Sequence, residues 1–129
     1  MSTINFKSEH HEKMCHRILD KMHNTDAYHT SLAYLLALDD NISYHDWRLE
    51  ACFDFKNDSI KPNVLEAAWI TGTDRRVLQL GFNLWNDTNS ADVSDVFGSG
   101  SDLEYLLEAV RIRFGGKDLF HVFYSTLGI

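Results

Sequence analysis

The sequence predicts an all-α fold: a compact single domain of five to seven helices, allowing for a short extended segment or a C-terminal strand. Its 129 residues include one proline, and turn-forming residues fall at wide intervals, which disfavours a sandwich of short strands. Apolar residues recur at helical spacing along most of the chain. A chain of this length fits one domain and can fold without a metal or a disulfide. Residues 1–7 are expected to be flexible.

Two well-marked helices are predicted first. Ser8 can cap a helix that runs to about His23, and Asp26 can cap a second helix through about Leu38. The apolar arc of the second helix is wide, which places it at the centre of the fold. The residues expected to face inward are Met14, Cys15, Ile18, Leu19 and Met22, then Tyr28, Leu32, Ala33, Leu35, Leu36 and Leu38.

In the middle of the chain the sequence predicts two helices that are shorter than the first two. The first covers residues 43–52, with Trp47 and Leu49 facing inward, and residues 53–60 could be extended. Pro62 suits the first position of the next helix, where its missing N–H costs nothing. The apolar residues of that helix are Val64, Leu65, Ala68 and Trp69.

Three further helical segments follow a turn at residues 71–73. Thr73 can cap a helix through about Trp85, in which Gly81 indicates a closely packed neighbour. A short helical turn is expected over residues 93–97. The last helix begins at a capping box, residues 101–104, and ends at two glycines, residues 115 and 116. Its expected buried residues are Leu103, Leu106, Leu107 and Val110.

Charge and cysteine usage restrict the functional classes. Twelve Lys and Arg against nineteen Asp and Glu give a net charge of −7, and residues 87–109 contain six acids and no Lys or Arg. Binding to duplex nucleic acid usually needs a cationic face, so it is not expected. The N-terminus lacks the pattern of a secretory signal, and no apolar run is long enough to span a membrane. We therefore expect a cytoplasmic protein in which Cys15 and Cys52 are reduced and buried.

One local arrangement suggests ligand binding. Residues 69–76 place a glycine turn, two hydroxyls and two guanidinium groups where a helix is expected to begin, and free backbone N–H groups there could hold an anion. The alternative is a plain joint between helices, in which Thr73 is the cap and the arginines pair with nearby acids. The candidate anion-binding residues are Thr71, Gly72, Thr73, Arg75 and Arg76.

The N-terminal histidines are the only candidates for a metal site. His11 with Cys15, or Glu12 with His16, has the four-residue spacing of two ligands on one helical face, but nothing fixes a third ligand. We favour solvated histidines beside a buried thiol, and expect neither a metal nor another cofactor. An enzyme is not expected, and a metal-dependent hydrolase remains the second alternative.

Aromatic residues supply a candidate partner surface. Trp47, Trp69 and Trp85 lie in apolar stripes and are expected in the core. The apolar tail, residues 116–129, is ambiguous between helix and strand and could dock on its own domain, on another protein or on a second copy. Its candidate partner-binding residues are Phe120, Phe123 and Tyr124. The favoured function is a protein–protein interaction or inhibitory accessory module, and the first alternative is an anion- or nucleotide-binding domain.

Three segments also carry a resemblance. They are Ile60-Lys-Pro62, Trp69 through Asn86, and Leu107 through Phe114. In these segments the chain resembles a family of small proteins from Gram-positive bacteria and their phages, which is known only as a domain of unknown function. The resemblance implies a compact helical domain in a bacterial or phage cytoplasm, and it supplies no activity and no catalytic residue.

Overall fold

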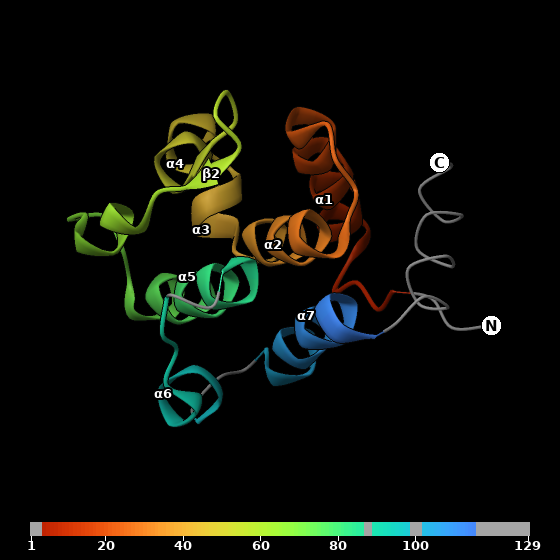
Figure 1. Ribbon diagram of the computed structural model, residues 1–129. Helices are drawn as coiled ribbons and strands as arrows, with labels where there is room; N and C mark the ends of the chain where they lie inside the picture. The colour runs from red at the N-terminus through yellow and green to blue at the C-terminus, as the bar shows by residue number, and fades with distance from the viewer. Residues whose placement is uncertain (1–3, 87–88, 99–101, 116–129) are drawn as a thin grey trace.

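The computed structural model describes residues 4–86, 89–98 and 102–115, and within them the fold is mostly helical (Figure 1). The prediction of an all-α domain is confirmed. The elements in chain order are α1 Glu9–Met22, α2 Ala27–Leu38, α3 Asp40–Ser43, α4 Asp46–Cys52, β1 Phe53–Asp54, β2 Ser59–Ile60, the 3₁₀ helix η1 Pro62–Glu66, α5 Gly72–Trp85, α6 Val93–Phe97 and α7 Leu103–Phe114.

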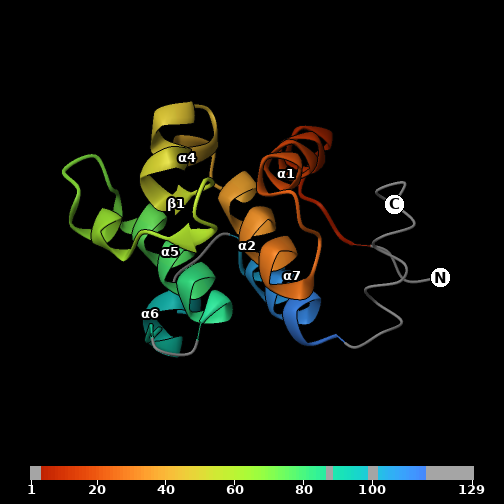
Figure 2. The ribbon, with the colours of Figure 1, turned by 45° about the horizontal axis from the view of Figure 1, so that its top comes forward.

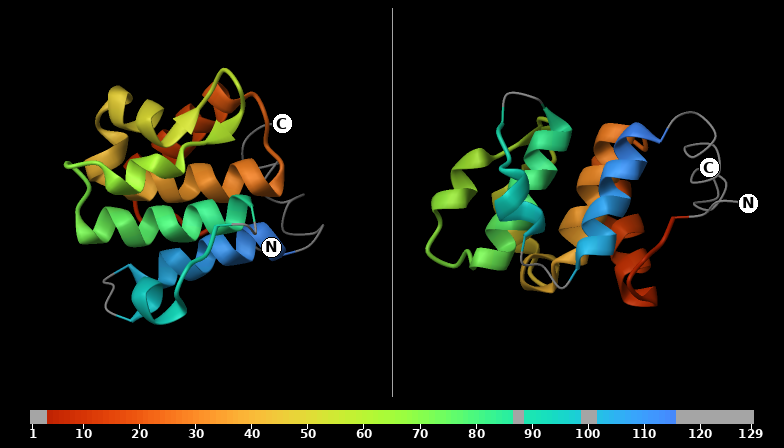
Figure 3. Two further views of the ribbon diagram at one scale, coloured as in Figure 1. Left: turned by 60° about the vertical axis from the view of Figure 1, so that its left-hand side comes forward. Right: turned by 90° about the horizontal axis from the view of Figure 1, so that it is seen from below.

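Helix α2 is the centre of the fold, as its wide apolar arc predicts. It packs against α1, α5 and α7 (Figures 2 and 3). Every residue from His29 to Leu38 is buried, whereas Tyr28, which we expected to face inward, is substantially exposed in the first turn. The predicted N-caps of α1 and α2 are confirmed, because Ser8 and Asp26 each accept a backbone N–H from the third residue beyond. The predicted stripe of α1 is buried throughout.

The middle of the chain differs from its prediction in two places. The expected helix over residues 43–52 starts only at Asp46, as α4. A separate turn, α3, precedes it and is capped by Asp39, which accepts the N–H of Ile42. Residues 53–60 form the extended segment, a hairpin that pairs Phe53 with Ile60. The prediction of a helix after Pro62 is wrong beyond η1, because the backbone becomes extended at Ala67, where ψ is 144°.

Helix α5 begins two residues earlier than predicted. Thr71, not Thr73, is its N-cap, because the Thr71 hydroxyl accepts the N–H of Asp74 and the Asp74 carboxylate accepts the N–H of Thr71. This reciprocal pair is a capping box. The close packing predicted at Gly81 is confirmed, since a Cβ there would lie 3.0 Å from a methyl carbon of Leu32.

Helix α7 buries a different face from the one predicted. Leu106 is buried as expected, together with Ala109 and Ile112, but Leu103 and Leu107 are exposed. The helix begins at Leu103, and the expected capping residue Ser101 lies outside the described residues. Residues 4–7, expected to be flexible, make specific contacts: Ile4 is buried, and the Tyr34 hydroxyl donates to the carbonyl of Asn5 at 2.6 Å.

Candidate functional site

The predicted anion-binding residues lie around two different hollows. Gly72, Arg75 and Arg76 line a hollow of about 420 Å³ between α5 and α6. Thr71 and Thr73 line a second hollow, on the side of Asp39 and Asp74. Arg76 donates to the Thr73 hydroxyl, and at the start of α5 the carboxylate of Asp74 accepts the backbone N–H of Thr71. Anion binding by these residues stays a prediction.

Two buried carboxyl groups, Asp39 and Asp74, lie together beside the second hollow. Asp74 is held as an acceptor, because its Oδ2 receives the N–H of Thr71 at 2.9 Å and the side-chain amide of Asn41 at 2.6 Å. The Oδ2 atom of Asp39 is buried and receives no donor. This oxygen can form a hydrogen bond if Asp39 is protonated there, because its O–H group can then donate to the carboxylate of Asp74.

The electrostatics of the pair agree with this assignment. Burial, the hydrogen bond to Asp74 and the negative charge of Asp74 raise the pKa of Asp39 to about 8. Burial also acts to raise the pKa of Asp74, but hydrogen bonds from Asp39, Thr71 and Asn41 outweigh it, and this pKa lies below its usual value. At neutral pH the pair therefore holds one proton, on Asp39, and one negative charge, on Asp74.

A polar path leads from this carboxyl pair to the surface. Asn41 donates its amide to Asp74, and both its backbone carbonyl and its Oδ1 accept from Arg48 at 2.7 Å. The guanidinium of Arg48 lies 4.9 Å from the ring centres of both Trp47 and Trp69, and these two rings meet edge to face with centres 5.5 Å apart. No salt bridge joins Arg48 to a carboxylate within the described part of the chain.

Trp47 contradicts the prediction that all three tryptophans lie in the core. It is 53% exposed, while Trp69 and Trp85 are half-buried and pack against the core. Leu49 and Cys52 turn the inner face of α4 to the core, and a residue two positions before Leu49 lies on the opposite side of a helix. Tyr44, 61% exposed, precedes the same helix and stacks on His10 with ring centres 5.0 Å apart. We call Tyr44, Trp47, Arg48 and Trp69 the Trp47 patch.

We expected the N-terminal histidines to be solvated, but one of them is not. His11 is buried, its Nδ1 accepts the N–H of Lys7 at 3.0 Å, and its protonated Nε2 therefore donates to the carbonyl of Tyr34 at 2.9 Å. Burial lowers the pKa of His11 and raises the pKa of the Cys15 thiol. Both residues of this predicted ligand pair thus belong to the core. Within residues 4–86, 89–98 and 102–115, no three His, Cys, Asp or Glu side chains are grouped as a metal site.

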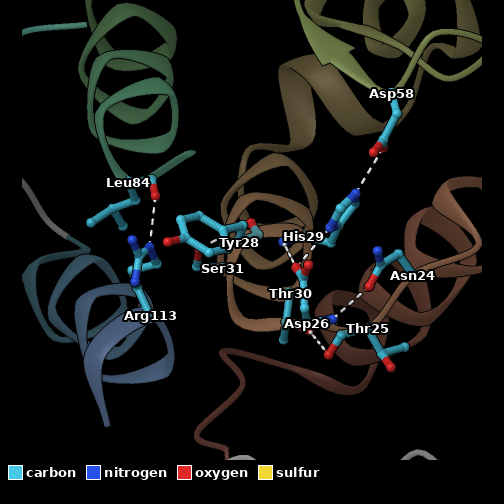
Figure 4. A network of polar contacts seen from close by, with 10 residues as sticks. All are labelled: Asn24, Thr25, Asp26, Tyr28, His29, Thr30, Ser31, Asp58, Leu84 and Arg113. Atoms are coloured by element: carbon cyan, nitrogen blue, oxygen red, sulfur yellow. Dashed lines mark hydrogen bonds and ion pairs between the residues drawn. The ribbon is translucent and has the colours of Figure 1, made fainter. Parts of the chain in front are cut away.

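His29 lies in the first turn of α2 and contacts carboxylates on both sides of its ring (Figure 4). Its two ring nitrogens lie 2.7 Å from carboxylate oxygens of Asp26 and Asp58, and its ring edge meets Trp85 with centres 4.7 Å apart. Both ring nitrogens therefore face carboxylate oxygens, one on each side of the ring. These contacts tie α2 to the hairpin turn, where Asp58 adopts a positive φ of 55°.

Sequence reasoning missed the carboxyl pair and the stacking of Arg48. A Thr followed three residues later by an acid, as at Thr71 and Asp74, is a visible capping signature and could have placed the start of α5. No local pattern links Asp39 to Asp74, because they are 35 positions apart in the sequence.

Comparison with known proteins assigns the chain to a family by its sequence. A model described as a family of unknown function, DUF6075, matches residues 1–121. The chain belongs to this family. The matched region includes every described element of this DUF6075 protein, with the carboxyl pair and the Trp47 patch. Among the predicted partner-binding residues, Phe120 lies within the match and Phe123 and Tyr124 beyond it, and all three are outside the described residues.

Further comparisons add no relative of known activity. No curated protein and no solved structure matches this DUF6075 chain. None of its described helices is long and apolar enough to cross a membrane.

Proposed function

We propose that this DUF6075 protein is a protein-binding module, an interaction or inhibitory accessory protein of a bacterium or phage, and that it binds its partner through the Trp47 patch. The observation that carries the proposal is the position of Trp47: more than half of its surface is exposed, yet its ring is fixed between neighbouring groups. A large aromatic side chain held in place loses little conformational entropy when a partner covers it.

The composition of the patch supports this proposal. Trp, Tyr and Arg are the residue types most enriched among those that dominate binding energy at protein interfaces. The patch combines all three: Tyr44 follows α3, Trp47 and Arg48 lie on α4, and Trp69 follows η1, and α4 contacts both α3 and η1. Single exposed apolar residues are common on soluble proteins, but an exposed tryptophan in contact with a second tryptophan and an arginine is typical of a contact surface.

The charge of Arg48 indicates the chemistry of the partner. Its hydrogen bonds go to neutral oxygens of Asn41, and it forms no salt bridge with a carboxylate of residues 4–86, 89–98 or 102–115. A partner segment that offers an acidic side chain next to an apolar one would complement both features. The overall net charge of −7 opposes a generally acidic partner, which restricts the complementarity to this patch.

The test is an affinity capture from lysate of the natural host with three bait proteins. The baits are the unmodified chain, Trp47→Ala, and the control Val93→Ala, which removes a 71% exposed side chain on α6, away from α4 in Figures 1 and 2. Circular dichroism checks that each bait is folded. We expect one protein that the first and third baits retain and that Trp47→Ala depletes by about tenfold or more.

Two results would overturn the proposal. One is a partner that all three baits retain equally, which would place binding elsewhere. The other is the absence of any protein enriched over an unrelated acidic bait.

Anion or nucleotide binding is the second candidate function, favoured by the hollow that Gly72, Arg75 and Arg76 share with α6. Two guanidinium groups beside one hollow can bind phosphate in a bidentate manner. This function predicts that inorganic phosphate or a nucleotide raises the melting temperature of the chain, and that Arg75→Ala with Arg76→Ala removes the effect. No rise at millimolar ligand would eliminate it.

A further inference from the structure

The buried carboxyl pair and the Trp47 patch share one contact residue, Asn41. Its side-chain amide donates to Oδ2 of Asp74 at 2.6 Å, and its Oδ1 and its backbone carbonyl each accept from Nη1 of Arg48 at 2.7 Å. The same planar amide group therefore contacts the pair with its nitrogen and the patch with its oxygen, and it cannot rotate without disturbing both. Asn41 lies in α3, two positions after Asp39, the protonated member of the pair.

The groups around Asp39 make this proton important. The charged or titratable residues that face the pair from the surrounding elements are Lys7, Asp40, Cys52, Asp74 and Asp102. Lys7 is engaged by Asp102 at 3.1 Å, and burial keeps the Cys52 thiol neutral by raising its pKa to about 12. Loss of the proton from Asp39 therefore places a second negative charge beside Asp74 while the lysine of this hollow is paired elsewhere.

Arg48 is the cation that can respond to this second charge. Its guanidinium already reaches the pair through Asn41, and its Nε atom is buried without a hydrogen-bond partner among the described residues. Two neutral oxygens and the two indole rings hold it in place. A hydrogen bond from a guanidinium to a carboxylate is stronger than either kind of contact at a partly exposed site.

We propose that the proton shared by Asp39 and Asp74 switches the Trp47 patch between two arrangements. With the proton present, Asn41 holds Arg48 against the tryptophans. Without it, Arg48 turns toward the two carboxylates, and the patch loses the arrangement that binds the partner. This inference rests on the proposed function of the patch as a binding surface.

The direction of the switch follows from the environment of Asp39. Burial, the hydrogen bond to Asp74 and the charge of Asp74 raise the pKa of Asp39 to about 8, so the proton is retained at about pH 7 and lost at about pH 9. The patch is therefore in its binding arrangement at neutral pH and leaves it in mildly alkaline solution.

The first test follows the patch in the protein alone, without a partner. Trp85→Phe removes one of the three tryptophans and leaves Trp47 and Trp69, both members of the patch, as fluorescent reporters. Fluorescence is recorded from about pH 6 to about pH 9 in this protein, and again after Asp39→Asn or Arg48→Met is added. Asp39→Asn supplies a donor that does not titrate. Arg48→Met changes a partly exposed position and leaves the buried pair intact.

The expected result is a fluorescence transition with its midpoint near pH 8 in the Trp85→Phe protein, and no such transition after either added substitution, with constant circular dichroism. Other titratable groups of the patch or beside it are common to all three proteins, so their effects recur in every curve; they are His10, Tyr44 and His45. Absence of the transition, or its retention after Asp39→Asn, would overturn the switch. Retention after Arg48→Met would also overturn it, because the tryptophans would then respond without Arg48. A parallel change in circular dichroism would indicate unfolding and would count against the switch.

A second measurement separates the switch from the proposed function. The partner found by affinity capture is bound to the unmodified chain and to Asp39→Asn at pH 7 and pH 9. About one molecule in ten retains the proton at pH 9, so we expect roughly tenfold weaker binding by the unmodified chain at that pH and no such loss for Asp39→Asn. The same pH dependence in both chains would overturn the switch and leave the proposed function intact. If capture finds no partner, the proposed function fails, while fluorescence still decides whether the patch is switched.

Discussion

Replacing Asp39 by Asn is expected to stabilise the fold at neutral pH and to remove part of its pH dependence. The amide oxygen of the new side chain can still accept the N–H of Ile42 at the start of α3. Its N–H group can take the place of the proton that Asp39 donates to Asp74. The substitution therefore keeps the hydrogen bonds of the pair and removes only the requirement that the folded protein retain a proton.

The magnitude follows from the pKa of Asp39, which is about 8 in the folded chain and about 3.9 in an unfolded one. Stability from a group whose pKa is raised on folding is fully present below the unfolded value and is lost as the pH rises toward the folded value. Between these limits the folded chain binds one more proton, and the free energy of unfolding falls by about 1.4 kcal/mol per pH unit. From pH 5 to pH 7 the unmodified chain thus loses stability on the order of 2–3 kcal/mol that Asp39→Asn retains.

Urea unfolding of both chains at pH 5, 6 and 7, followed by tryptophan fluorescence, measures this difference. His11, whose pKa burial lowers, and Asp74, whose pKa is lowered by hydrogen bonds, contribute stability that is lost as the pH falls. The contribution of His11 is the same in both chains and cancels in the difference. Asp74 keeps a hydrogen-bond donor from residue 39 in both chains and stays ionised from pH 5 to pH 7, so it adds no slope in this range. We expect the advantage of Asp39→Asn to grow with pH at the slope given above.

A difference that does not change with pH would refute the shared proton, and so would an Asp39→Asn chain that is less stable at every pH. Asp74→Ala is the matched control. It leaves the N–H donors of Thr71 and Asn41 without their acceptor, so we expect a loss of about 2 kcal/mol or more at pH 7.

Two further predictions concern α5 and are measured by the same unfolding assay. Thr71→Ala removes the side-chain half of the capping box and should cost about 1 kcal/mol, whereas Thr73→Ala should cost less than about half of that; equal losses would contradict the observed N-cap. Gly81→Val should cost about 2–3 kcal/mol, because the Cβ that it adds would lie 3.0 Å from a methyl carbon of the buried Leu32. A variant as stable as the unmodified chain would contradict the packing of α5 on α2.

The parts of the fold that were predictable are those encoded by neighbours in the sequence. Ser8 and Asp26 cap their helices because each cap depends only on the next three residues, and α2 lies at the centre because nearly its whole surface is apolar. The cap of α5 was assigned to Thr73 although Thr71 fits the same rule. Thr71 is favoured because its backbone N–H also donates to the carboxylate of Asp74. That carboxylate is held in place by the side-chain amide of Asn41, which belongs to α3.

Burial of apolar faces was predicted less well, because apolar spacing does not say which partner a face meets. In α7 two apolar faces compete, and α2 covers the one with Leu106 and Ile112. Trp47 shows the same limit in α4, where Leu49 and Cys52 take the inner face. In α4 the residue wrongly expected in the core, Trp47, is part of the surface for which we propose a binding partner. An apolar residue in a helical pattern that the core does not accept is thus informative about function.

The candidate site was the least predictable part, and its physical basis explains why. Burying two carboxyl groups is costly unless they share a proton and their remaining oxygens are paired. Here that pairing brings Asp39 and Asn41, at the start of α3, against Asp74 of α5, and Asn41 in turn accepts from Arg48, which contacts both tryptophans. The buried pair therefore fixes the orientation of an exposed aromatic surface. A hydrophobic pair in its place could fill the same volume but would leave Asn41, and with it Arg48, without an anchor.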